Sequence, residues 1–183
     1  MWLLIATVLA AAIVMVVTRG SLTALTRLRV TAFWLLAAGL IVQAALEYIA
    51  FPKSDIETIG YGLLMASYVL ILGFCLANST TRGFEVMAIG VAMNALVIGL
   101  NLGMPTRPIG DDANGNRIYM PVSQTVKHRQ ESGSDLLGFL GDKILFPRPF
   151  DTLVSFGDLV IAAGACELVF CASRRSSTSA IRA

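Results

Sequence analysis

The chain has 183 residues, of which 56% are hydrophobic and only 14% are charged. A soluble domain usually has about 45–50% apolar and about 25% charged residues, so this balance argues against a soluble globular enzyme. The net charge of +2 comes from 14 basic and 12 acidic residues with no basic stripe, which excludes a clear nucleic-acid-binding pattern. The length fits a single domain that covers residues 1–183.

Five apolar segments are long enough, or nearly so, to cross a bilayer as helices. The hydrocarbon core is about 30 Å thick and needs about 20 apolar residues, since each helical residue rises about 1.5 Å. The predicted fold class is therefore all-α, a polytopic bundle of five transmembrane helices. In the fourth segment, Gly99 and Gly103 form a GxxxG pair, which predicts close helix packing. The five segments are Trp2–Val17, 31–51, 59–77, 84–103 and 152–172.

The positions of the arginines predict the orientation of the chain in the membrane. Loops on the cytoplasmic side carry an excess of Lys and Arg, and the first helix usually dominates. The first span is followed by Arg19, Arg27 and Arg29, although the totals for the two sides are nearly balanced. We therefore expect the N-terminus outside, the tail 173–183 in the cytoplasm, and the polar loop 105–151 outside.

The long loop contains two predicted elements. Asn114-Gly115 is typical of a hairpin turn between two short strands. From Ser134 to Phe146, leucines recur at helical spacing after a capping serine, and Pro147 follows. This segment is too short to span the bilayer, so we expect an interfacial helix that covers the outer end of the bundle.

Polar side chains recur at one depth in three of the spans. An acid near the bilayer centre costs about 2.5–3.5 kcal/mol, so it usually has a partner or lines a wet cavity. If these helices are neighbours, the residues would form a polar pocket that opens outward beneath the loop. Two other interpretations stay open, namely hydrogen bonds that only join helices and a path for protons or ions. The predicted pocket residues are Gln43, Glu47, Asn101, Ser155 and Asp158, with Asn94 on the same face as Asn101 and His128 above them in the loop.

The sequence gives no indication of a metal site, a disulfide framework or a cofactor. His128 is the single histidine of the chain, and one histidine does not make a zinc site. Cys75, Cys166 and Cys171 all fall inside apolar spans, where they are expected to behave as small apolar groups. We therefore expect no metal and no cofactor.

A repeated Gly-Asp pair suggests an enzymatic alternative. Asp142 ends the loop segment, and Asp158 lies near the start of the last span. Two carboxylates that meet in a partly dry site can divide the roles of acid and base. The alternative hypothesis is therefore an intramembrane hydrolase with Asp142 and Asp158 as its catalytic pair. In the simpler interpretation, each Asp caps a turn or pairs with a nearby cation such as Lys143.

Four short motifs carry a resemblance to a known family. They are Asn-Leu-Gly-Met-Pro at 101–105, His128, Leu-Gly-Asp at 140–142 before Pro147, and Ser-Phe-Gly-Asp at 155–158. With these motifs, nearly the whole chain resembles a family of bacterial integral membrane proteins, of actinobacterial and firmicute type, classed as a domain of unknown function. The resemblance implies five spans and a plasma-membrane location, and it implies no activity.

A weaker likeness connects the last span to lipoprotein signal peptidase, whose last span also begins with an Asp. The chain has Ser-Phe-Gly-Asp at 155–158 where that enzyme has Phe-Asn-x-Ala-Asp, and it lacks the enzyme's first, Asn-rich aspartate motif. We therefore expect a non-enzymatic accessory protein, or one that binds a lipid or small ligand, with the hydrolase as the alternative. The expected partners are the lipid bilayer and other membrane subunits, and no nucleic acid.

Overall fold

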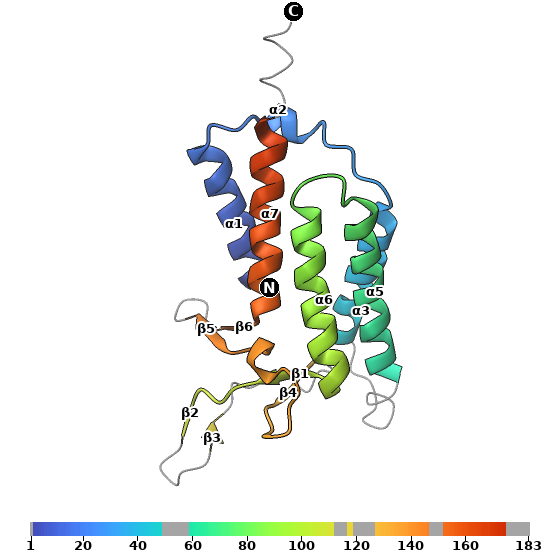
Figure 1. The fold of residues 1–183 in the computed structure, drawn as a ribbon, viewed down its shortest axis with the longest axis vertical. Helices are drawn as coiled ribbons and strands as arrows, with labels where there is room; N and C mark the ends of the chain where they lie inside the picture. The colour runs from blue at the N-terminus through green and yellow to red at the C-terminus, as the bar shows by residue number, and fades with distance from the viewer. Residues whose placement is uncertain (1, 49–58, 112–116, 119–126, 147–151, 175–183) are drawn as a thin grey trace, which may run out of the picture.

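The computed structural model describes residues 2–48, 59–111, 117–118, 127–146 and 152–174. Most of these residues are helical, as predicted, and six short strands accompany the helices in the described part (Figure 1). The helices of the described part are α1 (Trp2–Val17), α2 (Leu22–Leu25), α3 (Phe33–Tyr48), α5 (Tyr61–Ala77), α6 (Phe84–Asn101) and α7 (Phe156–Arg174).

Two of these helices, α6 and α7, are long and apolar enough to cross a membrane. Three shorter apolar stretches, Ile5–Val17, Phe33–Leu46 and Tyr61–Ala77, lie in α1, α3 and α5. The last predicted span began too early, because residues 152–154 form a strand and the helix begins only at Phe156.

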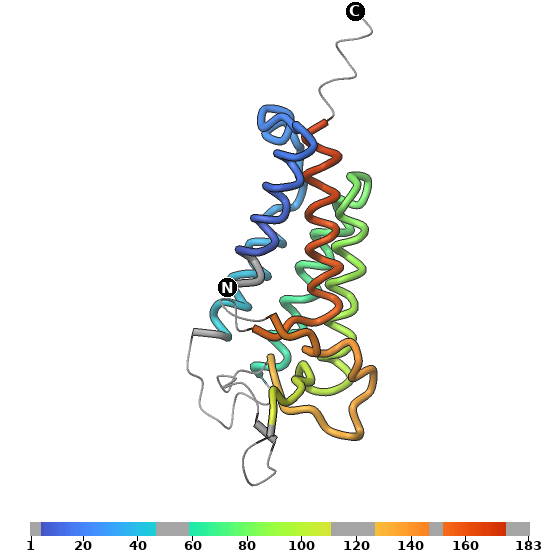
Figure 2. Tube along the Cα trace, turned by 90° about the vertical axis from the view of Figure 1, so that its left-hand side faces the viewer, coloured from blue at the N-terminus to red at the C-terminus, as the bar shows by residue number. Residues whose placement is uncertain are grey.

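The long helices form a curved row in the order α1, α7, α6, α5, α3. Each neighbouring pair in this row is in contact, and α2 also contacts α7 (Figure 1). Seen from the side, α1 and α3 lie toward one side of the row and α6 toward the other (Figure 2). Helices α5, α6 and α7 therefore stand in the middle of the molecule, and α1 and α3 stand at its edges.

Helices α6 and α7 approach each other closely because glycines face glycines. A Cβ atom added to Gly90 would lie 2.5 Å from the carbonyl oxygen of Gly157, and one on Gly164 would lie 2.7 Å from that of Gly83. Gly83 and Gly90 are seven residues apart, as are Gly157 and Gly164, which corresponds to about two helical turns. The close packing predicted at Gly99 is wrong, because a Cβ there would meet Met65 only at an ordinary 3.5 Å.

Gly103, the second residue of the predicted GxxxG pair, lies beyond the end of α6. Leu102 caps this helix in the left-handed conformation, and Gly103 has a φ of +142°. This glycine therefore turns the chain out of the helix into the loop, and it does not serve helix packing.

The loop after α6 folds into a small cap built on short strands. Strand β1 (Met104–Thr106) pairs in parallel with β4 (His128–Gln130), with Met104 opposite His128. On the other side of β1, Asp142 bridges to Thr106, and its N–H donates to the carbonyl oxygen of Pro105 at 2.9 Å. The cap therefore brings together three loop segments that are far apart in the sequence.

The predicted hairpin is confirmed by its strands. Strand β2 (Gly110–Asp111) pairs antiparallel with β3 (Arg117–Ile118), with Gly110 opposite Ile118. The turn residues 114–115 lie outside the described residues. A third antiparallel pair joins β5 (Ile144–Phe146) to β6 (Thr152–Val154), directly before α7.

The predicted helix over 134–146 is wrong. The structure has only a 3₁₀ turn, η2 (Gly138–Leu140), followed by strand β5. Leu137 has a left-handed backbone, with a φ of +53°. The N–H of Leu136 donates a hydrogen bond to the side chain of Asn101, and the carbonyl oxygen of Leu136 accepts one from it. These backbone groups are satisfied outside a helix, and the leucine spacing does not outweigh that competition.

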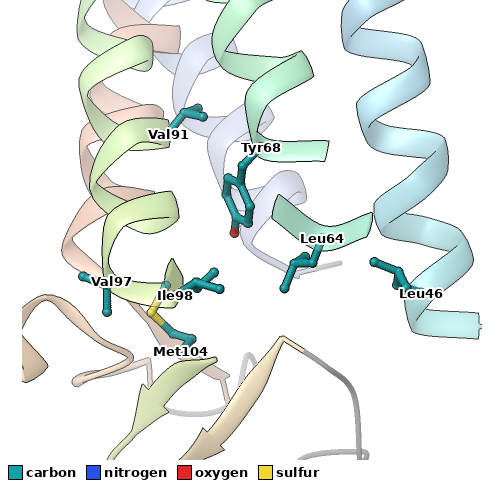
Figure 3. Packing of buried hydrophobic residues seen from close by; sticks show 7 residues of the cluster. All are labelled: Leu46, Leu64, Tyr68, Val91, Val97, Ile98 and Met104. Atoms are coloured by element: carbon teal, nitrogen blue, oxygen red, sulfur yellow. The ribbon is translucent and has the colours of Figure 1, made fainter. Parts of the chain in front are cut away.

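An apolar cluster connects the cap to the helices. Met104 is only 1% exposed, and it carries the start of β1 into the core between α5 and α6 (Figure 3). The other buried members of this cluster are Leu46, Leu64, Tyr68, Val91, Val97 and Ile98. The cap is therefore packed against the end of the bundle.

Candidate functional site

The candidate site lies between the inner face of the cap and the ends of α5, α6 and α7. Its centre is Tyr68 of α5, which is 5% exposed. The Tyr68 hydroxyl interacts electrostatically with Lys127, Asp158 and Asp142, which come from three different segments. We refer to Tyr68, Lys127, His128, Asp142 and Asp158 together as the Tyr68 site.

The cap contributes a histidine and a buried acid to this site. Alternate residues of a strand share a face, so His128 lies on the same face as the buried Met104 and Thr106 of the paired strand. Asp142 is 3% exposed, and its Oδ2 lies 2.9 Å from His128 Nδ1. When Asp142 is ionised, it can only accept, so the Nδ1–H of His128 donates this hydrogen bond.

The helices contribute a second hydrogen-bonded group at the start of α7. The Ser155 hydroxyl accepts a hydrogen bond from the backbone N–H of Asp158 at 3.0 Å and donates one to Asn94 Oδ1 at 2.9 Å. Asn94 Nδ2 in turn donates to Asp158 Oδ1 at 2.8 Å. Ser155 thus caps α7, and the Asp158 carboxylate stabilises the first turn of that helix.

The Tyr68 hydroxyl lacks a hydrogen-bond partner among the residues that the structure describes. Buried tyrosine hydroxyls usually have one, because leaving a buried donor or acceptor unsatisfied costs about 1–3 kcal/mol. The charges of one amine and two carboxyl groups act on this hydroxyl. The described residues thus leave one buried hydroxyl without a partner in a charged environment.

The structure brings several of the predicted pocket residues together in separate groups. Ser155 and Asp158 meet through Asn94, and His128 meets Asp142. Gln43 instead donates to the Ser67 hydroxyl at 3.2 Å, which joins α3 to α5. The prediction that all of these residues line one pocket stays a prediction.

Asn101 and Glu47 complete the predicted set. Both polar atoms of the Asn101 side chain bind the backbone of Leu136, with Nδ2 at 2.7 Å from its oxygen and Oδ1 at 2.9 Å from its nitrogen. Asn101 therefore anchors the cap to the end of α6. The side chain of Glu47 lies outside the described part of the structure.

The two candidate catalytic acids have different partners. Asp142 contacts His128, Asp158 contacts Asn94, and no hydrogen bond joins the two acids within the described residues. Both acids interact electrostatically with Tyr68. An acid–base pair of Asp142 and Asp158 stays a hypothesis.

Ion pairs hold the outer side of the cap. Arg129 pairs with Asp135, and its Nε donates to the carbonyl oxygen of Asn101 at 2.7 Å. Burial raises the pKa of the Asp135 carboxyl, but the N–H of Ser132 and the Arg129 guanidinium lower it more, so it falls below its ordinary value. Lys143 and Glu131 form a second pair.

In the described ranges, no group of three or more His, Cys, Asp or Glu side chains could hold a metal ion.

Two members of the Tyr68 site were missed by the sequence analysis. Tyr68 lies in an apolar run, where an aromatic residue is normally attributed to the core. Lys127 lies in a polar loop that offers many other bases. The signal that could have pointed to Tyr68 is its hydroxyl in the middle of a membrane-length segment, because tyrosine is otherwise enriched at the membrane interfaces.

The comparisons with known proteins give a family. A model described as a family of unknown function, DUF5317, matches residues 27–170. The chain belongs to this family. The match covers every residue of the Tyr68 site and agrees with the expected resemblance to a domain of unknown function. No curated protein and no solved structure matches the chain.

Proposed function

We propose that this member of the DUF5317 family is a five-span integral plasma-membrane protein that binds a small polar ligand or a lipid headgroup at the Tyr68 site and catalyses no reaction. The observation that carries the binding proposal is the buried Tyr68 hydroxyl, which faces charged groups without a hydrogen-bond partner among the described residues. A bound polar group would satisfy this hydroxyl.

The distribution of polar and apolar side chains supports a location in lipid. Large apolar side chains point away from the bundle on all five long helices, and Val17 of α1 is 75% and Ile41 of α3 is 68% exposed. Polar side chains such as Ser67 and Ser155 are completely buried. Such continuous apolar exposure is rare in soluble monomers, and lipid is the environment that would cover it.

The lengths of the helices are compatible with five spans. Helices α1 and α3 have 16 residues each and α5 has 17, which corresponds to about 24–26 Å at about 1.5 Å per residue. A bilayer core of about 30 Å can thin locally around shorter spans at a modest cost. We place the cap outside the cell and the opposite end, which carries the arginines between the spans, in the cytoplasm.

The binding proposal can be tested with a matched pair of tyrosine variants. Tyr68→Phe removes one hydroxyl at the site, whereas Tyr61→Phe removes one on the same helix that donates to the carbonyl oxygen of Gly99 at 3.0 Å. Native mass spectrometry of the full-length protein, extracted with its membrane lipids, would measure the bound mass. We expect a bound species in the wild type and in Tyr61→Phe, and its loss in Tyr68→Phe.

Two results would contradict the binding at the Tyr68 site, and a third would contradict the membrane location. A wild-type protein that carries no bound species would show that the Tyr68 site serves helix packing alone. A bound species that survives in Tyr68→Phe but disappears in Tyr61→Phe would place the ligand elsewhere. Extraction of the chain from membranes by alkaline carbonate would contradict the membrane location itself.

A second candidate function is the hydrolysis of a membrane lipid or lipoprotein. The observation that favours it is the contact between the buried Asp142 carboxylate and His128 Nδ1, because a carboxylate often orients a catalytic histidine in this way. If this function is correct, the purified protein hydrolyses such a substrate and Asp142→Asn or Asp158→Asn abolishes the activity. If the binding protein is correct, neither variant changes any lipid turnover.

A further inference from the structure

Five exposed arginines gather at the end of the bundle opposite the cap. The segments that carry them are the end of α1, the stretch around α2, the connection between α5 and α6, and the end of α7, which all lie at one end in Figure 1. We call these residues the arginine rim: Arg19, Arg27, Arg29, Arg82 and Arg174.

The guanidinium groups of the arginine rim are available to an external partner. Among the described residues, none of the five forms an ion pair, and Arg174 instead lies over the ring of Phe170 at 4.6 Å. At the cap end, by contrast, Arg129 pairs with Asp135 and Lys143 pairs with Glu131. Two bases of the cap are therefore neutralised by acids of the cap, whereas no arginine of the arginine rim has such an acid among the described residues.

Few acids oppose the arginine rim. The acids of the helices at this end are Glu85, in the first turn of α6, and Glu167, two turns before the end of α7. Five arginines against two glutamates leave an excess of positive charge in the described part of this end. An excess of this kind raises the local concentration of anions.

Apolar side chains lie next to the arginine rim on the side of the bundle. Val16 and Val17 precede Arg19 at the end of α1, and Leu22 begins α2; all three are highly exposed. An apolar belt followed by arginines is the pattern of a helix end at the level of lipid headgroups. The charge and the apolar belt therefore suit the same kind of partner.

We infer that the arginine rim binds the phosphate groups of anionic phospholipids in the adjacent leaflet. Guanidinium groups bind phosphate oxygens through paired hydrogen bonds, and the apolar side chains would contact the acyl chains. This inference rests on the proposed membrane location and is independent of the Tyr68 site, which lies at the other end of the bundle.

The test uses the full-length protein in neutral detergent with added phosphatidylglycerol or phosphatidylcholine of the same acyl chains. We expect phosphatidylglycerol to raise the melting temperature more than phosphatidylcholine, and 0.5 M NaCl to reduce the difference by screening. Arg82→Gln should shift the midpoint of the phosphatidylglycerol titration to an about five-fold higher lipid concentration. The matched control is Arg107→Gln, an exposed arginine after β1 at the cap end, which should leave the midpoint unchanged.

Three outcomes would overturn the inference. Equal stabilisation by both lipids would show that the arginine rim does not select anionic headgroups. An equal effect of Arg82→Gln and Arg107→Gln would show only a general dependence on net charge. Equal stabilisation by a soluble poly-glutamate peptide would indicate an acidic protein as the partner. In each case the protein would still be retained by membranes, so failure of the proposed membrane location would be seen separately, by carbonate extraction.

Discussion

Ser155 connects three polar groups at the start of α7. Its hydroxyl binds the backbone of Asp158 and the side chain of Asn94, and it is completely buried. A hydroxyl in this position satisfies a helix N–H and also fixes the amide of Asn94, which binds Oδ1 of Asp158.

Replacing Ser155 by alanine should destabilise the protein. The change leaves the N–H of Asp158 and Oδ1 of Asn94 without this partner, and we expect a loss of about 0.5–2 kcal/mol in the free energy of unfolding. The measurement is reversible unfolding in mixed micelles with increasing denaturing detergent. The exposed Ser134→Ala, which loses only a hydroxyl contact with Ser132, serves as the control and should be neutral. Equal stability of the two variants would contradict the capping role.

The Asp135 carboxyl should make the cap sensitive to acid. Its pKa in the folded protein lies below the ordinary value of 3.8, so its contribution to stability is fully present above that value. The contribution is lost as the pH falls through the folded pKa, because protonation breaks the pair with Arg129. We expect the protection of residues 129–140 against hydrogen exchange, corrected for the intrinsic effect of pH on exchange, to fall at acid pH in the wild type. In Asp135→Asn, this protection should already be low at neutral pH and should change less with acid.

Helix packing between α6 and α7 depends on small residues at two levels. Gly90 faces Gly157 and Gly83 faces Gly164, so the two backbones are nearly in contact. At this distance a methyl group at Gly90 has no space, since two of its three nearest neighbours are backbone atoms, the oxygen of Gly157 and the nitrogen of Ile161.

Gly90→Ala should therefore cost about 1–3 kcal/mol of stability through overpacking. Gly62→Ala is the matched control, because Gly62 is also helical and a Cβ there would meet no atom within 4 Å. The control should be neutral or slightly stabilising, since alanine favours helix more than glycine does. Thermal melting of both variants in the same detergent compares them. A Gly90→Ala protein as stable as Gly62→Ala would contradict the close approach.

The helices and the folded loop differ in how well the sequence predicts them. Long apolar runs predict α1, α3, α5, α6 and α7 because one physical requirement, a continuous apolar stretch, dominates each of them. The segment 134–146 has helical spacing but forms only a 3₁₀ turn and strand β5, because the side chain of Asn101 competes for the backbone of Leu136. That contact spans 35 residues, and no local pattern contains it.

In the site, too, local patterns are predictable from the sequence and long-range contacts are not. The spacing predicts Ser155 and Asp158 on one face of the last span. In the structure Ser155 instead lies directly before α7 as its N-cap, and Asn94 is the partner of both residues. The meeting of His128 with Asp142 depends on the order of strands in the cap, which the sequence does not determine. Tyr68 was missed because a buried tyrosine hydroxyl becomes informative only when its surroundings are known.

On the scale of the whole molecule, the cap and the arginine rim define two opposite ends. We expect Ser134→Cys, on the cap, to react with a membrane-impermeant maleimide in intact cells. Thr23→Cys, beside the arginine rim, should react only after lysis. Both positions are exposed, and both variants are made in a background without Cys75, Cys166 and Cys171. Labelling of Thr23→Cys in intact cells would reverse the proposed orientation.

The position of α1 in the row has a consequence for biosynthesis. The helix contacts α7 most, yet α7 is synthesised only after all the residues that separate the two helices. Translation of this intervening stretch at about 5–20 residues per second separates the two helices by roughly seven to thirty seconds. Until then, α1 lacks its main neighbour, so this part of the bundle is completed only when α7 arrives between α1 and α6.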